Sequence, residues 1–337
     1  MAAGRDRRRP APGRFLGRLL LAVPDTYAAL LVLYLLLRVL SGDRLWPVAL
    51  LSTFLHWALL PSFVLLPAMI WARRWPTAAM LGMNVVLFLG LFGGLFLPPA
   101  PGPADSYDLT VMTCNLENDS TEPDALVAAL RSLEADVVAL QELTVEQAAA
   151  IERDLQESYP YQALYGAGIP GKGLLSRYPI LEETLFYLQA QRLPYLRATL
   201  AVEGAVTPVT VIVAQPPPPH LVGASYRIPP GAAAEIGSLA EMSAAGGPVV
   251  LLGDFNMTDQ NDNYALLAEA GLTDAFRAVG QGFGTTWPAR GIGPLRRLVR
   301  IDYVWHSAHF RAVAAWVGPD VGSDHLPVLA RLAWRRE

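Results

Sequence analysis

The sequence contains little cysteine, histidine or lysine. Cys114 is the only cysteine among 337 residues, Lys172 is the only lysine, and there are five histidines. A single cysteine excludes an intrachain disulfide bond, and one cysteine without a cluster of histidines argues against a zinc site. Because Cys114 lies in an apolar, strand-like segment, we expect it to be buried and unreactive.

Charged residues make up only 17% of the chain, and they are distributed unevenly. Residues 1–104 hold 10 arginines and 3 aspartates, a net charge of +7, whereas residues 105–337 hold 16 basic and 27 acidic residues, a net charge of −11. Sequence-independent binding of nucleic acid depends on Lys and Arg contacts to phosphates. An acidic segment with one lysine is poorly suited to a long polyanion, so nucleic acid is the less favoured partner.

Three long apolar runs lie before residue 100, roughly at residues 19–40, 46–71 and 77–97. A membrane-spanning helix needs about 20 mostly apolar residues. One cleaved signal peptide does not account for three such runs. The sequence therefore predicts a membrane region over residues 1–98 with three transmembrane helices, which makes the lipid bilayer a partner.

The positions of the arginines predict the orientation of these spans. Six arginines lie within residues 5–18, and Arg73 and Arg74 separate the second run from the third, whereas one Arg and one Asp cancel within residues 41–45. Cytoplasmic loops carry an excess of Lys and Arg. We therefore expect a cytoplasmic N-terminus and, after three spans, a domain on the outer side of the cell membrane.

A Pro- and Gly-rich stretch at residues 99–106 predicts a short linker. Residues 107–337 are long enough for one large domain. Strand-like runs occupy 108–114, 136–141, 195–202, 206–214, 248–253, 299–305 and 311–318, and helix-like runs occupy 122–134, 144–156 and 231–244. This mixture predicts an α+β domain in which helices cover β-sheets.

Acids, amides and a histidine follow or interrupt several of these hydrophobic runs. They are Asn115, Glu117, Glu142, Asp254, Asn256, Asp302, Asp324 and His325. Each alone is an ordinary turn or capping residue, but so many at strand ends are hard to obtain by chance. Asp254 and Asn256 lie two residues apart and would face one side of an extended chain. Such oxygen ligands suit Mg²⁺, with Mn²⁺ as an alternative, and a histidine beside acids can bind a phosphate oxygen or transfer a proton.

Six short segments resemble, in order, the motifs of the metal-dependent endonuclease/exonuclease/phosphatase superfamily. They are 113-TCNLE-117, 140-LQE-142, 175-LSRYP-179, 253-GDFN-256, 302-DYVW-305 and 323-SDH-325. The resemblance covers about residues 107–335. It implies a four-layer α/β/β/α sandwich, with two β-sheets face to face and helices outside, here preceded by the three transmembrane helices.

The resemblance also implies roles for the catalytic residues. Asp254 would orient or deprotonate the attacking water, and Asn256 would contact the phosphate. His325 would bind the scissile phosphate, and Asp302 would hold its imidazole in place. Asn115 would help to hold the phosphate or the ligands of the metal.

By the same resemblance, Glu142 would be the principal metal ligand and Asp324 a second acid near the metal. The sequence departs from the family at one point. The strand that usually ends in a histidine, or in some branches a tyrosine, here ends in Gln215, and His220 follows beyond four prolines. Either residue is a candidate for substrate binding, although Gln215 cannot carry a proton.

The three spans and the outward topology resemble bacterial membrane proteins linked to vancomycin and teicoplanin resistance. That resemblance implies a membrane-anchored, extracytoplasmic, Mg²⁺-dependent phosphohydrolase or phosphodiesterase acting on lipid-linked phosphates of the cell envelope. A membrane tether would raise the effective concentration of such substrates. Two alternatives stay open: an extracytoplasmic metal-dependent nuclease, and a catalytically impaired binding or sensor protein, which the missing histidine suggests. The sequence does not indicate an oligomeric state.

Overall fold

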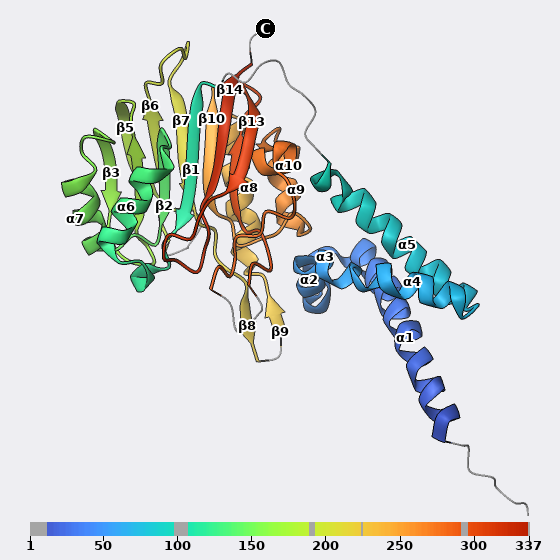
Figure 1. Ribbon diagram of the computed structural model, residues 1–337. Helices are drawn as coiled ribbons and strands as arrows, with labels where there is room; N and C mark the ends of the chain where they lie inside the picture. Colours follow the sequence, from blue (N-terminus) through green and yellow to red (C-terminus); the bar gives the residue numbers. More distant parts are fainter. Residues whose placement is uncertain (1–11, 98–106, 189–192, 224, 291–295, 336–337) are drawn as a thin grey trace, which may run out of the picture. The chain divides into compact units, whose positions relative to one another are not determined.

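The computed structural model describes residues 12–97, 107–188, 193–223, 225–290 and 296–335 (Figure 1). The predicted linker, residues 99–106, lies outside these residues. The chain divides into two compact units. The first comprises Met1–Leu51 and Leu55–Gly94, and the second comprises Ser52–Phe54 and Leu95–Glu337. Each unit is described by itself.

The first unit is helical. Its elements are α1 (Pro12–Ser41), η1 (Gly42–Arg44), α2 (Trp46–Thr53), α3 (Leu55–Leu59), α4 (Pro61–Trp71), α5 (Trp75–Phe92) and η2 (Gly93–Phe96). Helix α5 packs against α1, α3 and α4. A small buried cluster of Ala28, Met69, Ala78 and Leu81 joins these helices. The apolar runs of the sequence therefore form helices, as expected.

Two of these helical segments are long and apolar enough to cross a membrane. They are Ala22–Arg44, with a mean hydropathy of 1.7, and Trp75–Phe96, with a mean hydropathy of 2.0. The second predicted span is broken, because Trp46–Thr53 and Leu55–Trp71 meet at an angle of 84°. This pair counts as a third span only if the bent segment crosses the membrane as a whole, so the prediction of three spans is not confirmed.

The charged residues within the first apolar run are paired with side chains that carry the opposite charge or donate a hydrogen bond. Asp25 accepts hydrogen bonds from Arg74 and Thr77. Arg38 forms an ion pair with Asp43 at 3.2 Å. Paired charges are much less costly than isolated ones in an apolar environment, so Asp25 and Arg38 are compatible with a helix in a bilayer.

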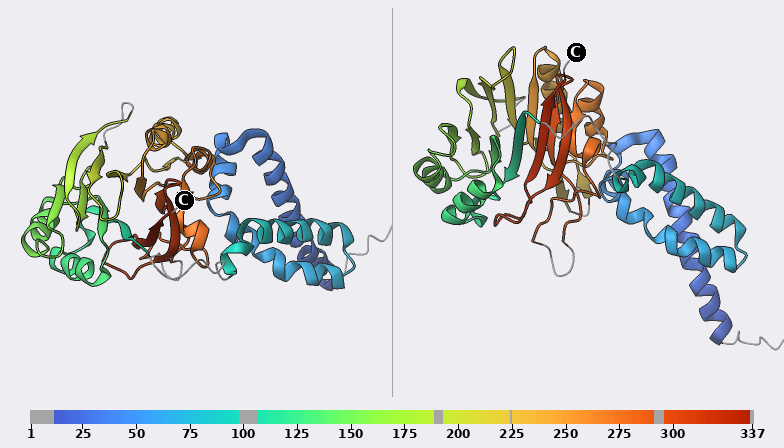
Figure 2. Two further views of the ribbon diagram at one scale, coloured as in Figure 1. Left: turned by 90° about the horizontal axis from the view of Figure 1, so that it is seen from above. Right: turned by 45° about the horizontal axis from the view of Figure 1, so that its top comes forward.

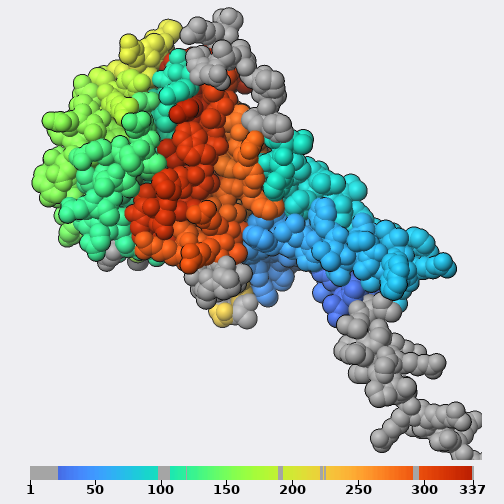
Figure 3. Space-filling model, in the orientation of Figure 1, coloured from blue at the N-terminus to red at the C-terminus, as the bar shows by residue number. Residues whose placement is uncertain are grey.

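The second unit contains two six-stranded sheets. The first has the strand order β13-β14-β1-β2-β4-β3. Its strands are β1 (Leu109–Asn115), β2 (Val137–Gln141), β3 (Tyr161–Tyr165), β4 (Lys172–Ser176), β13 (Phe310–Val317) and β14 (Val328–Trp334). Only the β1–β2 pair is parallel. Figure 3 shows green and red segments, from opposite ends of this unit's sequence, side by side on one face.

The second sheet has the strand order β11-β12-β10-β7-β6-β5. Its strands are β5 (Ile180–Phe186), β6 (Tyr195–Leu200), β7 (Val209–Ala214), β10 (Val249–Asp254), β11 (Thr273–Asp274) and β12 (Asp302–His306). Here β7 and β10 are the parallel pair. A separate two-stranded sheet is formed by β8 (His220–Val222) and β9 (Ser225–Arg227).

The two sheets pack face to face, and helices cover both outer faces (Figure 2). The first sheet buries its outer face against α6 (Pro123–Leu133) and α7 (Val145–Asp154). The second buries its outer face against α8 (Pro230–Ala244) and α9 (Asp262–Glu269). The short helices η3 (Asn118–Ser120) and α10 (Ala275–Val279) complete the unit. The predicted α+β two-sheet sandwich is thus confirmed.

Alternation along the strands decides which residues face the space between the sheets. In β10, Val250 and Leu252 belong to the core between the sheets, whereas Val249 and Leu251 contact the helices. Because side chains alternate along a strand, Asp254 at the end of β10 points the same way as Leu252. The inner face of this strand therefore ends in a buried carboxylate.

Candidate functional site

Polar side chains gather at one end of the core between the two sheets. The strands β1, β2, β7 and β10 have their carboxyl ends here, and β4 and β12 begin here because each runs antiparallel to its neighbour. The register pairs Gln141 with Lys172 and Asp254 with Asp302. The inward positions at this end are Asn115, Gln141, Lys172, Gln215, Asp254 and Asp302, and all six are buried.

An amide and carboxylate cluster connects the two sheets at this end. The Asn115 side chain donates a hydrogen bond to Glu142 Oε1 at 3.1 Å and another to Asp254 Oδ2 at 3.0 Å. The Gln215 side chain donates to the same Glu142 oxygen at 2.7 Å. Residues from β1, β2, β7 and β10 thus meet around two carboxylates, which is what the strand-end pattern predicted.

His325 and Asp302 form a buried pair beside this cluster. The Nδ1 atom of His325 lies 3.0 and 3.2 Å from the two carboxylate oxygens of Asp302. Its Nε2 atom lies 3.9 Å from Asp254 Oδ2 and 3.7 Å from Asp324 Oδ1. A carboxylate on Nδ1 fixes the tautomer and the direction of an imidazole, so Nε2 faces the other acids.

The protonation states of this pair follow from burial and from neighbouring charge. Burial disfavours the imidazolium, but the charges of Asp302 and Asp254 outweigh it and raise the pKa of His325 to about 10. Burial raises the pKa of Asp254 to about 7, although His325 opposes this shift. The site thus holds an imidazolium next to a carboxylate that titrates near neutral pH, a combination typical of acid–base sites.

Asp324 is held by the chain around it. Its Oδ2 atom accepts a hydrogen bond from the Trp287 indole at 2.9 Å, and its backbone N–H donates to Glu117 Oε2 at 3.1 Å. Its Oδ1 atom is buried and has no hydrogen-bond partner among the described residues. Burial also raises the pKa of the Asp324 carboxyl. A buried carboxylate oxygen without a donor is a position where a cation fits.

Three site residues have left-handed backbone conformations. The φ angles are 50° at Glu117, 58° at Glu142 and 52° at Asn256. Such angles are uncommon for residues other than glycine and cluster at functional sites. The strand β10 ends at Asp254, so the chain is not extended at Asn256, contrary to the expectation that both side chains face one side. The Asn256 side chain instead donates to the Pro216 carbonyl at 3.0 Å.

The two candidates for the missing histidine lie in different places. Gln215 is 3% exposed and contacts the cluster through Glu142. His220 is exposed on β8, and no hydrogen bond connects it with the cluster among the described residues. Lys172 and Trp287 contact the cluster but were not among the predicted site residues. The only feature of the sequence that could have pointed to Lys172 as a site residue is that it is the single lysine of the chain.

The donor set of the site fits a hard divalent cation. Ligand atoms of Asp254, Asp302 and His325 lie within 4.8 Å of one another, which makes this group a candidate metal site. Both oxygens of Asp302 already contact His325 Nδ1, however. The remaining oxygens belong to carboxylates, which Mg²⁺ and similar ions prefer. The acids of the site, Glu117, Glu142, Asp254, Asp302 and Asp324, outnumber its cations, Lys172 and His325.

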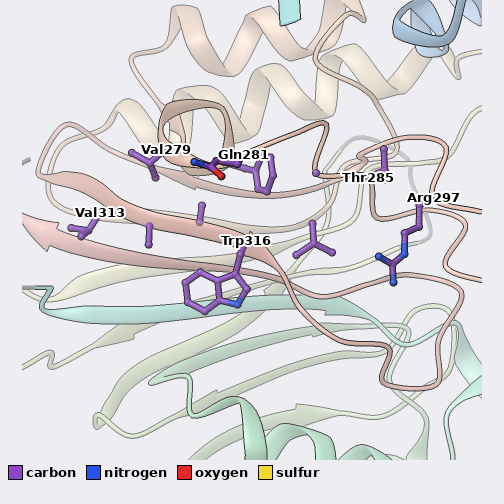
Figure 4. A pocket seen from close by; sticks show the side chains of 11 residues that line it. Val279, Gln281, Thr285, Arg297, Val313 and Trp316 are labelled. Carbon is purple, nitrogen blue, oxygen red and sulfur yellow. The ribbon is translucent and has the colours of Figure 1, made fainter. Parts of the chain in front are cut away.

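A cavity of about 580 Å³ lies elsewhere in the second unit (Figure 4). It is lined by residues of α10 and β13 and by neighbouring loops, among them Val279, Gln281, Thr285, Arg297, Val313 and Trp316. None of its lining residues belongs to the acid, amide and histidine cluster. The candidate site is therefore assigned from the convergence of titratable groups and not from this cavity.

Solved structures with the same fold come from several organisms. An endonuclease/exonuclease/phosphatase from Beutenbergia cavernae is 24% identical, with a TM-score of 0.53 over 68% of this chain and 72% of that chain. One from Bacteroides vulgatus is 18% identical, with a TM-score of 0.55 over 68% and 100% of the two chains. TDP2 of D. rerio, complexed with a single-strand DNA product, is 17% identical, with a TM-score of 0.54 over 68% and 99%.

Comparison with curated proteins finds no match. The profile of the Endonuclease/Exonuclease/phosphatase family, by contrast, matches residues 112–325, which include every residue of the cluster. Members of this family are in general metal-dependent phosphoester hydrolases, among them phosphodiesterases and nucleases. Since the match covers more than half of the chain, this protein belongs to the Endonuclease/Exonuclease/phosphatase family.

Proposed function

We propose that the protein is a membrane-anchored, Mg²⁺-dependent phosphohydrolase or phosphodiesterase that acts outside the cytoplasm on lipid-linked phosphates of the cell envelope. The observation that carries the hydrolytic part is the buried Asp302–His325 pair, whose Nε2 atom faces Asp254 at 3.9 Å. A protonated donor and a carboxylate that titrates near neutral pH can act as the general acid and the general base in phosphoester hydrolysis by water.

Each residue of the cluster has a role in this proposal. The His325 imidazolium donates from Nε2 to a phosphate oxygen, and Asp302 keeps the Nδ1 proton in place. Asp254 accepts a proton from the attacking water. Asn115 holds the carboxylates of Asp254 and Glu142 at a fixed separation, because one side-chain amide donates to both. Asn256 contributes a further amide at the rim of the site.

We assign the cation to Glu142 and Asp324. Glu142 Oε1 accepts two amide hydrogen bonds, which leaves Oε2 for a cation, and Asp324 Oδ1 has no donor among the described residues. Oxygen donors favour Mg²⁺, and Mn²⁺ is a suitable substitute. When bound, such an ion stabilises the charge on the phosphoryl group.

The location of the second unit depends on how often the chain crosses the membrane. Arginines precede the first span, and Arg73 and Arg74 follow the bent pair of helices. Arg74 contacts Asp25, near the start of the first span rather than its end at Arg44. This contact supports a bent segment that returns to the side where the chain began, so that α5 leads outward.

Charge supports a small or lipid-linked substrate over a long polyanion. Residues 105–337 carry a net charge of −11, and their one lysine is fully buried. A nuclease remains the second candidate, because the structurally similar TDP2 of D. rerio was solved with a single-strand DNA product. A nuclease with this composition would favour a short strand end, since the net charge of −11 opposes contacts with phosphates along a duplex.

The test uses the full-length protein in detergent with Mg²⁺ or Mn²⁺. Phosphate release is followed from lipid pyrophosphates and lipid monophosphates, with plasmid DNA and a short single strand assayed in parallel. His325→Ala removes the proposed phosphate donor, and His309→Ala, an exposed histidine on the same unit, is the matched control. Lipid turnover that is lost only in His325→Ala supports the proposal. Cleavage of DNA alone transfers the assignment to a nuclease, and no turnover with bound metal favours a binding role.

Location is tested separately by adding trypsin to spheroplasts that express the protein with a C-terminal tag. Loss of the tag in intact spheroplasts supports an outer position of the second unit. A tag that is protected until the membrane is disrupted contradicts it.

A further inference from the structure

Lys172 is fully buried at the start of β4. Its ammonium group donates to Gln215 Oε1 at 2.8 Å, to the Gly171 carbonyl at 3.2 Å and to the Pro170 carbonyl at 3.3 Å. A lysine ammonium has three protons to donate. Because three acceptors already take them, Lys172 has no proton left for a substrate, and any influence on the reaction acts through its neighbours.

Strand alternation places this cation at the inner end of the site. Lys172 lies on the same face of β4 as Leu174, which belongs to the core between the sheets, and it pairs in register with Gln141. Burial lowers the pKa of Lys172 to about 8, while the charges of Glu142 and Asp254 oppose this shift. Burying an ammonium is costly, so a chain that keeps its only lysine here gains something other than stability.

We propose that Lys172 is a positioning residue that fixes the direction of the Gln215 side-chain amide and, through it, the carboxylate of Glu142. An ammonium can only donate, so it requires the oxygen of the amide and turns the nitrogen away. That nitrogen donates to Glu142 Oε1 at 2.7 Å. A glutamine without such a partner can exchange its oxygen and nitrogen, which have nearly the same shape.

The direction of this amide matters for the cation and for the phosphate. With its nitrogen toward Glu142, Gln215 restrains Oε1 and leaves Oε2 for a metal ion. The second proton on the same nitrogen is a fixed donor for a phosphate oxygen. If the amide were reversed, its oxygen would oppose Glu142 and repel the substrate. This inference rests on the proposed function in one respect, the assignment of Glu142 as a metal ligand.

The affinity for Mn²⁺, measured by calorimetry on the full-length protein in detergent, tests the inference without any substrate. Lys172→Met removes the charge and the donors but keeps the chain length. If Lys172 acted only through its charge, its removal would tighten Mn²⁺ binding, because a positive charge near a metal ligand repels the cation. If Lys172 served only to stabilise the fold, the Mn²⁺ affinity of each folded molecule would not change. Only the positioning role predicts weaker binding. We expect a loss of about 10- to 100-fold, the usual effect of altering a residue that orients a metal ligand.

A double-mutant cycle shows whether the effect passes through Gln215. We expect Gln215→Ala to weaken Mn²⁺ binding to a similar extent, and we expect Lys172→Met to add less than about twofold in that background. Leu175→Ala, a buried change on the same strand, is the control for stability. It should lower Tm without changing the Mn²⁺ affinity. If Lys172→Met does not fold, Lys172→Gln replaces it in the test. A glutamine at position 172 can both donate and accept, so it allows both directions of the Gln215 amide.

Tighter or unchanged Mn²⁺ binding in Lys172→Met overturns the inference, and so do losses that multiply in the double variant. Failure of the proposed function gives a different result. A wild-type protein that hydrolyses nothing but loses Mn²⁺ affinity on Lys172→Met supports the inference and not the proposed activity. A wild-type protein that binds no Mn²⁺ contradicts both.

Discussion

Replacing Asp302 by Asn should move the pH range in which the protein is active. The substitution keeps the shape of the side chain and removes the charge that faces His325 Nδ1 at 3.0 Å. The pKa of His325 is raised from 6.5 to about 10, and Asp302 is the largest cause of the increase. A shift of that size corresponds to roughly 5 kcal/mol of preference for the imidazolium, most of which the variant loses.

The size of the effect at a given pH follows from the fraction of imidazolium. If the pKa of His325 falls to about 6.5 in the variant, about 3% of the molecules carry the imidazolium at pH 8, a loss of about 30-fold. Near pH 5.5 His325 is protonated in both the wild type and the variant. The remaining difference in activity then reflects only the lost orientation of the His325 ring. A raised histidine pKa contributes stability that is complete below pH 6.5 and is lost as the pH approaches 10. The difference in the free energy of unfolding between the wild type and Asp302→Asn should show the same pH dependence.

Two measurements check this prediction. The first is kcat/KM between pH 5.5 and 9.5, with Asp320→Asn, the same change at an exposed acid, as the control. The second is an NMR titration of His325 in the metal-free protein, with the signal assigned by its loss in His325→Gln. Parallel pH profiles, with a constant ratio of activities across the range, would refute the argument that the Asp302 charge maintains an imidazolium.

Three further predictions concern the same region. Asp254→Asn should lower the rate by about 10²- to 10⁴-fold. Because burial raises the pKa of Asp254 to about 7, this change should also raise Tm at pH 8, where ionisation of the acid opposes folding, but not at pH 4. Trp287→Phe should weaken metal binding by about 10- to 100-fold with little change in Tm, since Asp324 loses its indole donor. Cys114, whose thiol pKa is raised by burial, should resist iodoacetamide at pH 8 until the protein is unfolded.

The sequence predicted the strands whose hydrophobic runs are buried on both faces. The run at 248–253 corresponds to β10 (Val249–Asp254), all of whose residues are buried. The run at 136–141 corresponds to β2 (Val137–Gln141), which is equally buried. Such strands are easily recognised in a sequence, because they form continuous apolar runs in which neither face carries polar residues. The polar residues at the ends of these strands were therefore conspicuous, and the structure brings them together at one end of the core.

Strands with exposed or charged residues were missed. Four of the seven residues of β5 (Ile180–Phe186) are exposed, since it lies at the edge of its sheet. The strand β4 (Lys172–Ser176) begins with a lysine and a glycine, and it is absent from the strand-like runs of the sequence. Burial of that lysine depends on Gln215, which is 43 positions away in the sequence. Local patterns contain no information about a partner at that distance.

The backbone at the site is the other feature that local patterns did not predict. Asn256 was expected to continue the extended strand, but its φ of 52° turns the side chain toward the Pro216 carbonyl. Asparagine is among the residues that tolerate this conformation, so its identity permits the turn without requiring it. The turn is stabilised by the bond from its own N–H to Asp254 Oδ1 at 2.9 Å.

The charges of the site indicate how binding of the proposed cation and of the proposed anionic substrate would be linked. Lys172 donates its three protons to other groups, and Asp302 engages one nitrogen of His325, so the two cations of the site leave one N–H, that of His325 Nε2, for an anion. The surrounding acids would repel a phosphate that approached them alone. A divalent cation held by Glu142 and Asp324, as proposed above, would offset this repulsion, because it would supply two positive charges to the site. If the proposed function holds, substrate affinity and metal affinity should therefore rise and fall together.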